Sequence, residues 1–150
     1  MTRKAGVAAA AGIPFTKGHG TQNDFILLPD LDSVLELTTG RVCALTDRHG
    51  GLGADGVLRV VRTAACAEVA EQAGEARWFM DYRNADGSTA EMCGNGARLF
   101  ARYLLEHELE TKQQFAIATR GGLREVTVVE DVISERWVQL CRCRSRRRSR

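Results

Sequence analysis

The sequence of 150 residues lacks any apolar run close to the roughly 20 residues that a membrane-spanning helix requires, so we expect no membrane partner. It also lacks a convincing secretory signal, because residues 5–12 follow two basic residues but are too weakly apolar for the core of one. We therefore expect residues 1–13 to be a disordered leader, or to lie upstream of the true start.

Cysteine is present in an odd number, five, which argues against a disulfide framework and for a reducing compartment, here the cytoplasm. Cys43 falls among the apolar positions of a predicted helix and is expected in the core, whereas Cys66 falls in a surface segment. Cys141 and Cys143 lack the partner cysteines or histidines of a soft-metal site. None of the three histidines has ligand spacing with another, so no metal is expected.

The net charge is small, +2, but it is unevenly distributed. Residues 142–150 hold six arginines and no acid, and subtracting these six charges leaves −4 for residues 1–141. Clustered guanidiniums can neutralise the phosphates of a nucleic acid. This run has no interleaved aromatic residues, however, so we interpret residues 131–150 as an atypical basic tail, expect it to be disordered and do not expect a nucleic-acid partner. Salt-sensitive DNA binding that disappears when residues 142–150 are deleted would support the alternative.

The composition is that of a globular domain, with 44% hydrophobic and 27% charged residues. Turn residues divide the chain into predicted strands at residues 25–28, 57–61, 77–83, 115–119 and 123–129. Residues 63–76 have no clean periodicity and are expected to form a surface excursion.

Two helices are predicted between these strands. One is capped by Thr38 or Thr39 and runs to about residue 48, with Val42, Ala44 and Leu45 facing inward. The other begins at residues 93–96 and carries apolar side chains at helical spacing, at Ala97, Phe100, Ala101 and Leu104. Hairpins around one amphipathic helix predict an α+β fold, in which a curved, mostly antiparallel sheet is wrapped around a central helix.

The segment Met92-Cys-Gly-Asn-Gly-Ala-Arg98 is the most informative for chemistry. It places Cys93 just before a helix whose free N–H groups and positive dipole end can hold a carboxylate and favour the thiolate form of the cysteine. From these residues alone, a small cysteine buried before a glycine-rich helix start explains the pattern equally well.

Asn23 and Asn84 each lie in a glycine-bearing turn. Their amides offer both a donor and an acceptor to the polar groups of an amino acid. Taken singly, each is better explained as a turn residue that bonds its own backbone.

Several motifs together resemble one family, the diaminopimelate epimerases, over roughly residues 14–130. They are Phe15-Thr-Lys-Gly-His-Gly-Thr-Gln-Asn-Asp-Phe25, Asp47-Arg-His-Gly-Gly-Leu-Gly-Ala-Asp-Gly56, Tyr82-Arg-Asn-Ala-Asp-Gly-Ser-Thr-Ala-Glu-Met-Cys-Gly-Asn-Gly-Ala-Arg98 and Ala116-Ile-Ala-Thr-Arg-Gly-Gly122. Related racemases of proline type share a similar Cys-Gly start, but Asn95 and the turns at Asn23 and Asn84 favour the diaminopimelate branch.

The resemblance implies a cofactor-independent amino-acid epimerase of lysine biosynthesis, whose small-molecule substrate, diaminopimelate, lies between two similar domains. Cys93 matches one of two catalytic cysteines, and Asn23 and Asn84 match substrate-binding asparagines. Gly94 and Asn95 match the turn that receives the α-carboxylate of the substrate. Gly56 matches a position that carries a substrate-contacting glutamine in some relatives.

The second catalytic cysteine belongs to a C-terminal half that this sequence does not contain. After Asp131 the expected strand and turn give way to unrelated residues, as after a frame shift or a fusion. Two hypotheses therefore stay open, an epimerase that uses Cys93 and a catalytically silent half-domain. A half-domain with an uncovered interface can also form a homodimer.

Overall fold

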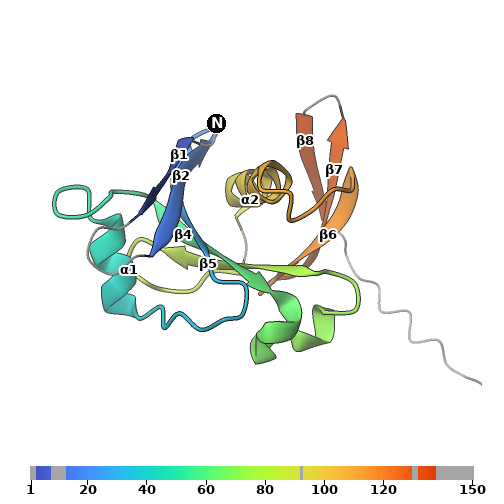
Figure 1. Cartoon of the computed structure of the whole chain (residues 1–150), viewed down its shortest axis with the longest axis horizontal. Coiled ribbons are helices and arrows are strands. Elements are labelled where there is room, and N and C mark those ends of the chain that lie inside the picture. The colour runs from blue at the N-terminus through green and yellow to red at the C-terminus, as the bar shows by residue number, and fades with distance from the viewer. Residues whose placement is uncertain (1–2, 8–12, 92, 130–131, 138–150) are drawn as a thin grey trace, which may run out of the picture.

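The strands lie across a single curved sheet in the same order as in the sequence (Figure 1). The structure, a computed structural model, describes residues 3–7, 13–91, 93–129 and 132–137. The sheet formed by these residues has eight strands, β1 (Arg3–Val7), β2 (Pro14–Gly20), β3 (Asn23–Pro29), β4 (Gly56–Arg62), β5 (Trp78–Asn84), β6 (Gln114–Thr119), β7 (Gly122–Val129) and β8 (Val132–Trp137). The helices are α1 (Thr39–Thr46), α2 (Gly94–Glu106) and two 3-10 helices, η1 (Thr63–Ala65) and η2 (Ala67–Gln72).

Most neighbouring strands are antiparallel. The two exceptions are β3 with β4 and β5 with β6, and each of these parallel pairs is joined by a crossover that contains a helix, α1 or α2. The fold is therefore α+β with a mixed, mostly antiparallel sheet that does not close on itself, and the predicted fold class is confirmed.

Helix α2 lies in the hollow of the sheet, between the arm formed by β1 and β2 and the arm formed by β6, β7 and β8 (Figure 1). The four apolar positions predicted from helical spacing, Ala97, Phe100, Ala101 and Leu104, are fully buried. They pack against alternate residues of the central strands, including Leu58 on β4 and Met80 on β5, since alternate side chains of a strand share one face.

The opposite face of the sheet carries two smaller apolar clusters. One is covered by α1 through Val42, and the other is covered by η2 through Val69. Between them, Arg59 and Asp81 point away from α2 and are almost wholly buried. A charged pair therefore occupies the centre of this second layer.

Helix α1 departs in part from the prediction. Thr38 does cap it, accepting a hydrogen bond from the backbone N–H of Arg41 (3.2 Å), but the helix ends at Thr46, because Asp47 leaves the helical conformation. Cys43 is exposed and so is Ala44, so the expectation that both face the core is wrong. Only Val42 and Thr46 of this short helix are buried, because the face it turns to the sheet is narrow.

Three other segments differ from the expected boundaries. The excursion at residues 63–76 contains η1 and η2, and the side chains of Val69 and Gln72 are buried. Strand β1 lies within the expected leader, and β8 lies within the expected tail; each pairs antiparallel with its neighbour. Apart from Ile13, the other residues of those two segments lie outside the described residues. They are 1–2, 8–12, 131 and 138–150, which include Cys141, Cys143 and the arginine run. Within the described part of the chain, no helix combines the length and the apolar character that a membrane crossing requires.

Candidate functional site

The predicted site residues converge at one end of the sheet. Strand β3 begins at Asn23 and the parallel strand β4 begins at Gly56, while the antiparallel strand β5 ends at Asn84, the register partner of Gly56. Helix α2 begins near the same end, because the first-turn residue Asn95 contacts Asn23. Segments that are distant in the sequence thus meet where their chains turn.

Cys93 is the N-cap of α2. Its backbone is extended (φ −140°, ψ 121°), and its carbonyl accepts the first helical hydrogen bond, from Ala97 N–H at 2.8 Å. The N–H groups of Gly94, Asn95 and Gly96 therefore precede the helical ladder and point out of its positive end. The Cys93 side chain is half-buried beside the main apolar core and makes no capping bond.

Asn95 and Asn23 are joined side chain to side chain. The amide of Asn95 donates to Asn23 Oδ1 (2.8 Å), while Asn23 Nδ2 donates to Asp55 Oδ2 (3.2 Å). Asn95 Oδ1 in turn accepts a short hydrogen bond from Arg98, one turn further along α2. The side-chain oxygen and nitrogen of both asparagines therefore each have a hydrogen-bond partner, which holds both side chains in one orientation.

A charged cluster holds Asp55, the hydrogen-bond partner of Asn23. Arg48 bonds both carboxylate oxygens of Asp24 (2.8 and 3.1 Å) and one of Asp55 (3.1 Å), and the backbone N–H of each aspartate donates to the carboxylate of the other. The hydrogen bond from Arg48 holds the pKa of Asp24 well below its ordinary value. The loop that contains Asp55 is thereby tied to the start of β3, where Asn23 lies.

Asn84 is held through Tyr82. The Tyr82 hydroxyl donates to Asn84 Oδ1 (2.8 Å), and Asn84 Nδ2 donates to Ser88 in the adjacent turn (3.0 Å). Burial raises the pKa of the Tyr82 hydroxyl. The Tyr82 ring also packs edge-on against Phe25 of β3, with 5.9 Å between the ring centroids.

Two glycines allow the elements to approach closely. A Cβ built on Gly20 would lie 2.7 Å from the backbone oxygen of Asn95, so any larger residue would force β2 and the first turn of α2 apart. A Cβ on Gly56 would lie 2.6 Å from the backbone oxygen of Arg83. The site has no room at residue 56 for the glutamine side chain that the resemblance places there in some relatives.

The structure thus brings Asn23 and Asn95 into contact beside Gly94 and Cys93. Asn84 lies at the same end of the sheet and is bonded to Tyr82, whose ring packs against Phe25 on β3. Sequence reasoning missed the supporting residues Arg48, Asp55 and Arg98. All three lie inside the motifs quoted above, so their position was available, but pairing across the fold cannot be read from spacing. Among the described residues, no cluster of three or more His, Cys, Asp or Glu side chains could hold a metal ion.

The fold is shared with the PhzF family. The chain resembles a phenazine biosynthesis protein of that family from Enterococcus faecalis with a TM-score of 0.54 at 12% identity, covering 74% of this chain and 36% of that one. The Bacillus anthracis protein of the same family gives a TM-score of 0.54 at 20% identity, covering 78% and 36% of the two chains. These similarities define the class of fold.

Sequence comparison assigns the chain to one family within this class of fold. The model of the diaminopimelate epimerase family matches residues 15–136, and the chain belongs to that family. It is 55% identical over 119 residues to the diaminopimelate epimerase of Streptomyces coelicolor, 58% over 121 residues to that of Thermobifida fusca and 55% over 119 residues to that of Mycobacterium tuberculosis. These matches cover 75–79% of this chain but only 41–44% of the relatives, so the chain spans about two fifths of their length. The family model also matches residues 132–136, so the expectation that unrelated residues begin directly after Asp131 is wrong.

Proposed function

We propose that this chain is the N-terminal half of a cofactor-independent diaminopimelate epimerase of lysine biosynthesis, with residues 14–130 as its core and Cys93 as one of two acid/base groups. The observation that carries the proposal is the position of Cys93 at the N-cap of α2, beside the paired amides of Asn23 and Asn95, in a chain of this family. Diaminopimelate is the substrate in the names of the relatives.

The first-turn N–H groups of α2, at Gly94 and Asn95, would bind the α-carboxylate of the substrate. The thiolate of Cys93 would take the α-proton and become the thiol, and the electron pair left on the α-carbon would delocalise into the bound carboxylate. Donors fixed in advance at a helix N-terminus stabilise such a charge without reorganising during the reaction. Asn23 and Asn84 would orient the remaining polar groups of the substrate.

Inversion of the α-carbon needs a second proton donor on the opposite face. In the proposed enzyme this group comes from a second half. The short coverage of the relatives favours a second candidate function for the chain alone, a half-domain that binds substrate weakly and does not turn it over.

The exchange of the α-proton of LL-diaminopimelate with deuterated solvent separates the two candidates. Exchange by the chain alone that is abolished in Cys93→Ser supports acid/base chemistry at this residue. Cys43→Ser is the matched control, because Cys43 is an exposed cysteine on α1, and it should leave exchange unchanged. Exchange that survives Cys93→Ser contradicts the assignment, whereas no exchange in any variant identifies the chain alone as a silent half-domain.

A further inference from the structure

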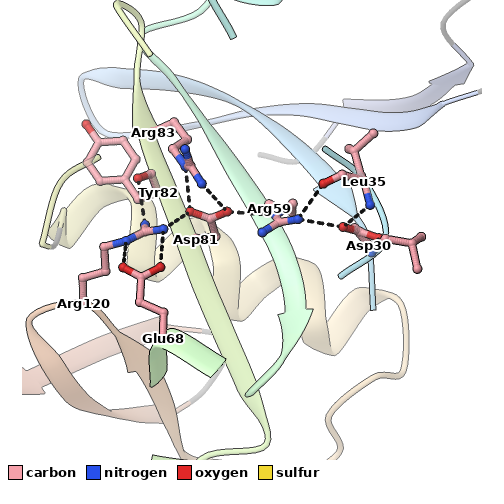
Figure 2. Close-up of polar contacts among 9 residues, drawn as sticks. Asp30, Leu35, Arg59, Glu68, Asp81, Tyr82, Arg83 and Arg120 are labelled. Atoms are coloured by element: carbon pink, nitrogen blue, oxygen red, sulfur yellow. Dashed lines mark hydrogen bonds and ion pairs between the residues drawn. The ribbon is translucent and has the colours of Figure 1, made fainter. Parts of the chain in front are cut away.

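Three arginines converge on one buried carboxylate behind the site. Asp81 on β5 has no exposed side-chain surface, and its oxygens accept bonds from Arg59 (2.8 Å), Arg83 (2.9 Å) and Arg120 (2.7 Å), as Figure 2 shows. Burial alone would raise the pKa of Asp81, but the hydrogen bond from Arg83 and the charges of Arg120 and Arg83 hold it below its ordinary value. Asp81 is therefore an anion around which the arginines are arranged.

The arginines lead in different directions from Asp81. Arg59 extends toward the segment that follows β3, where it donates to Asp30 Oδ2 and to the backbone oxygen of Leu35 (both 2.9 Å). Arg120 runs toward η2, where its Nε and Nη2 bond the two carboxylate oxygens of Glu68 (2.7 and 3.2 Å) (Figure 2). Three carboxylates thus balance three guanidiniums.

Arg120 also stands in the β6–β7 turn, and this turn contacts the segment that leads into Cys93. The backbone N–H of the next residue, Gly121, donates to the carbonyl of Glu91 at 3.0 Å. A Cβ on Gly121 would lie 3.4 Å from both the Cβ and the carbonyl oxygen of Glu91, so the two backbones are in contact.

A second set of contacts secures the same turn and segment. Gln72 bonds both the N–H and the carbonyl of Thr119, the residue before Arg120. The backbone oxygen of Tyr82 accepts bonds from both Arg120 and Ala90 N–H. The segment before Cys93 is thus held between β5 and a turn that is itself anchored to Asp81.

We propose that Arg120 is a positioning residue: anchored on Asp81 and Glu68, it fixes Ala90 and Glu91 and thereby the placement of Cys93 at the start of α2. Buried ion pairs add little net stability because desolvation offsets their attraction, and their better attested use is to fix one arrangement. The positioning of the segment stands on the contacts alone. Its importance for catalysis rests on the proposed function of Cys93.

The test compares Arg120→Gln with Arg59→Gln in the full chain. Both variants remove one arginine from Asp81 and leave it two others, but only Arg120 leads to the Cys93 segment. The readouts are amide hydrogen exchange at Ala90 and Gly121 and the rate at which iodoacetamide alkylates Cys93, followed by mass spectrometry of the cysteine peptide. Circular dichroism checks that each variant is folded.

Arg120→Gln is expected to raise exchange at both amides about tenfold or more and to change Cys93 alkylation several-fold. Arg59→Gln should stay within about twofold of the parent chain, and Arg120→Lys, which keeps a charge beside Asp81, should lie between the parent and Arg120→Gln. If Arg120→Gln does not fold, Arg120→Lys against Arg59→Lys gives the same comparison.

Unchanged exchange and alkylation in the folded Arg120 variants would overturn the proposal, as would equal changes in the Arg120 and Arg59 variants, which indicate general loosening. No readout depends on turnover of diaminopimelate. A failure of this inference is therefore distinguishable from a failure of the proposed function.

Discussion

At the scale of single residues, the site is organised by amides that are used in both directions. Asn23 donates to Asp55 and accepts from Asn95, so neither end of its amide is free to turn without losing a partner. Under the proposed function, a substrate would meet side chains that are already oriented by the cluster around Arg48 and by Arg98. Such preorganisation reduces the conformational entropy that these side chains lose on binding.

The contact between Gly20 and the first turn of α2 gives a prediction at this scale. Gly20→Ala should lower the free energy of unfolding by about 1–3 kcal/mol, because its Cβ meets the backbone oxygen of Asn95 at 2.7 Å and backbone cannot swing aside. Urea denaturation of the full chain measures this.

Gly40→Ala is the matched control, because a Cβ at Gly40 meets nothing within 4 Å and lies inside α1. It should be neutral or stabilise the chain by about 0.5 kcal/mol. Equal destabilisation by both substitutions would contradict this prediction, because a Cβ at Gly40 has no close contact to explain a loss of stability.

The prediction from the sequence succeeded unevenly for these residues. The turn motifs located Asn23 and Asn84. The side-chain partners of Asn84, Tyr82 and Ser88, are close in sequence, but these bonds go to their side chains and not to the backbone of the turn. The explanation as a turn residue that bonds its own backbone is wrong for Asn23, whose side-chain partners Asp55 and Asn95 are 32 and 72 residues away along the chain. A motif shows which residue types are present, but a partner so distant in sequence is set by the fold.

At the scale of elements, the turn after β5 is docked against α1. Gly87 has a positive φ of 84°, and a Cβ there would lie 2.8 Å from the Cα of Thr39 at the start of α1. The buried hydroxyl of Thr46 also donates to the carbonyl of Ala85 in the turn (2.9 Å). Helix α1 therefore supports the turn that carries Asn84.

Substitution of Gly87 tests this docking. Gly87→Ala should cost about 2–4 kcal/mol of unfolding free energy, because backbone strain and a clash with α1 add together. The measurement is the midpoint of thermal or urea unfolding.

Gly122→Ala separates the two contributions. Gly122 has a positive φ of 104° but nothing within 4 Å of its Cβ, so only strain of about 1–2 kcal/mol is expected. A Gly122 variant as unstable as the Gly87 variant would contradict the docking of the turn on α1.

Helix α2 could be predicted from its pattern because its apolar residues recur every three or four positions and its start carries the glycines of the motif. The 3-10 helices could not be predicted, since an alanine- and glutamate-rich segment has no period and its burial depends on Val69 reaching the second cluster. The charged pair of Arg59 and Asp81 also escaped prediction, because the strand face that carries charged residues is usually exposed to solvent.

At the scale of the whole molecule, acid should destabilise the chain. Asp24 and Asp81 have pKa values held below the ordinary 3.8 in the folded state, so the folded chain binds fewer protons than the unfolded chain between those values and 3.8. Their contribution to stability is complete above about pH 5 and is lost as the pH falls through the folded-state pKa values. The urea midpoint should therefore fall by about 1 M or more between pH 5 and pH 2.5.

Two aspartate variants check the source of this dependence. Asp24→Asn should flatten the change in midpoint with pH, because Asp24 is paired with Arg48 in the cluster behind Asn23. Asp32→Asn should not, because the Asp32 side chain is 73% exposed and its pair with Arg62 is screened by solvent. Equal flattening by both would assign the acid sensitivity to surface charge in general.

Under the proposed function, this chain carries the working N-terminal half of a diaminopimelate epimerase. The most direct measurement uses a chimera in which residues 1–136 are followed by the part of the Streptomyces coelicolor enzyme that lies beyond the match. Its substrate is LL-diaminopimelate in deuterated water. We predict α-deuteration with conversion to the meso isomer, both abolished by Cys93→Ser and retained in Cys43→Ser. A folded chimera that binds diaminopimelate but neither exchanges nor inverts it, or that does both without Cys93, would contradict the claim.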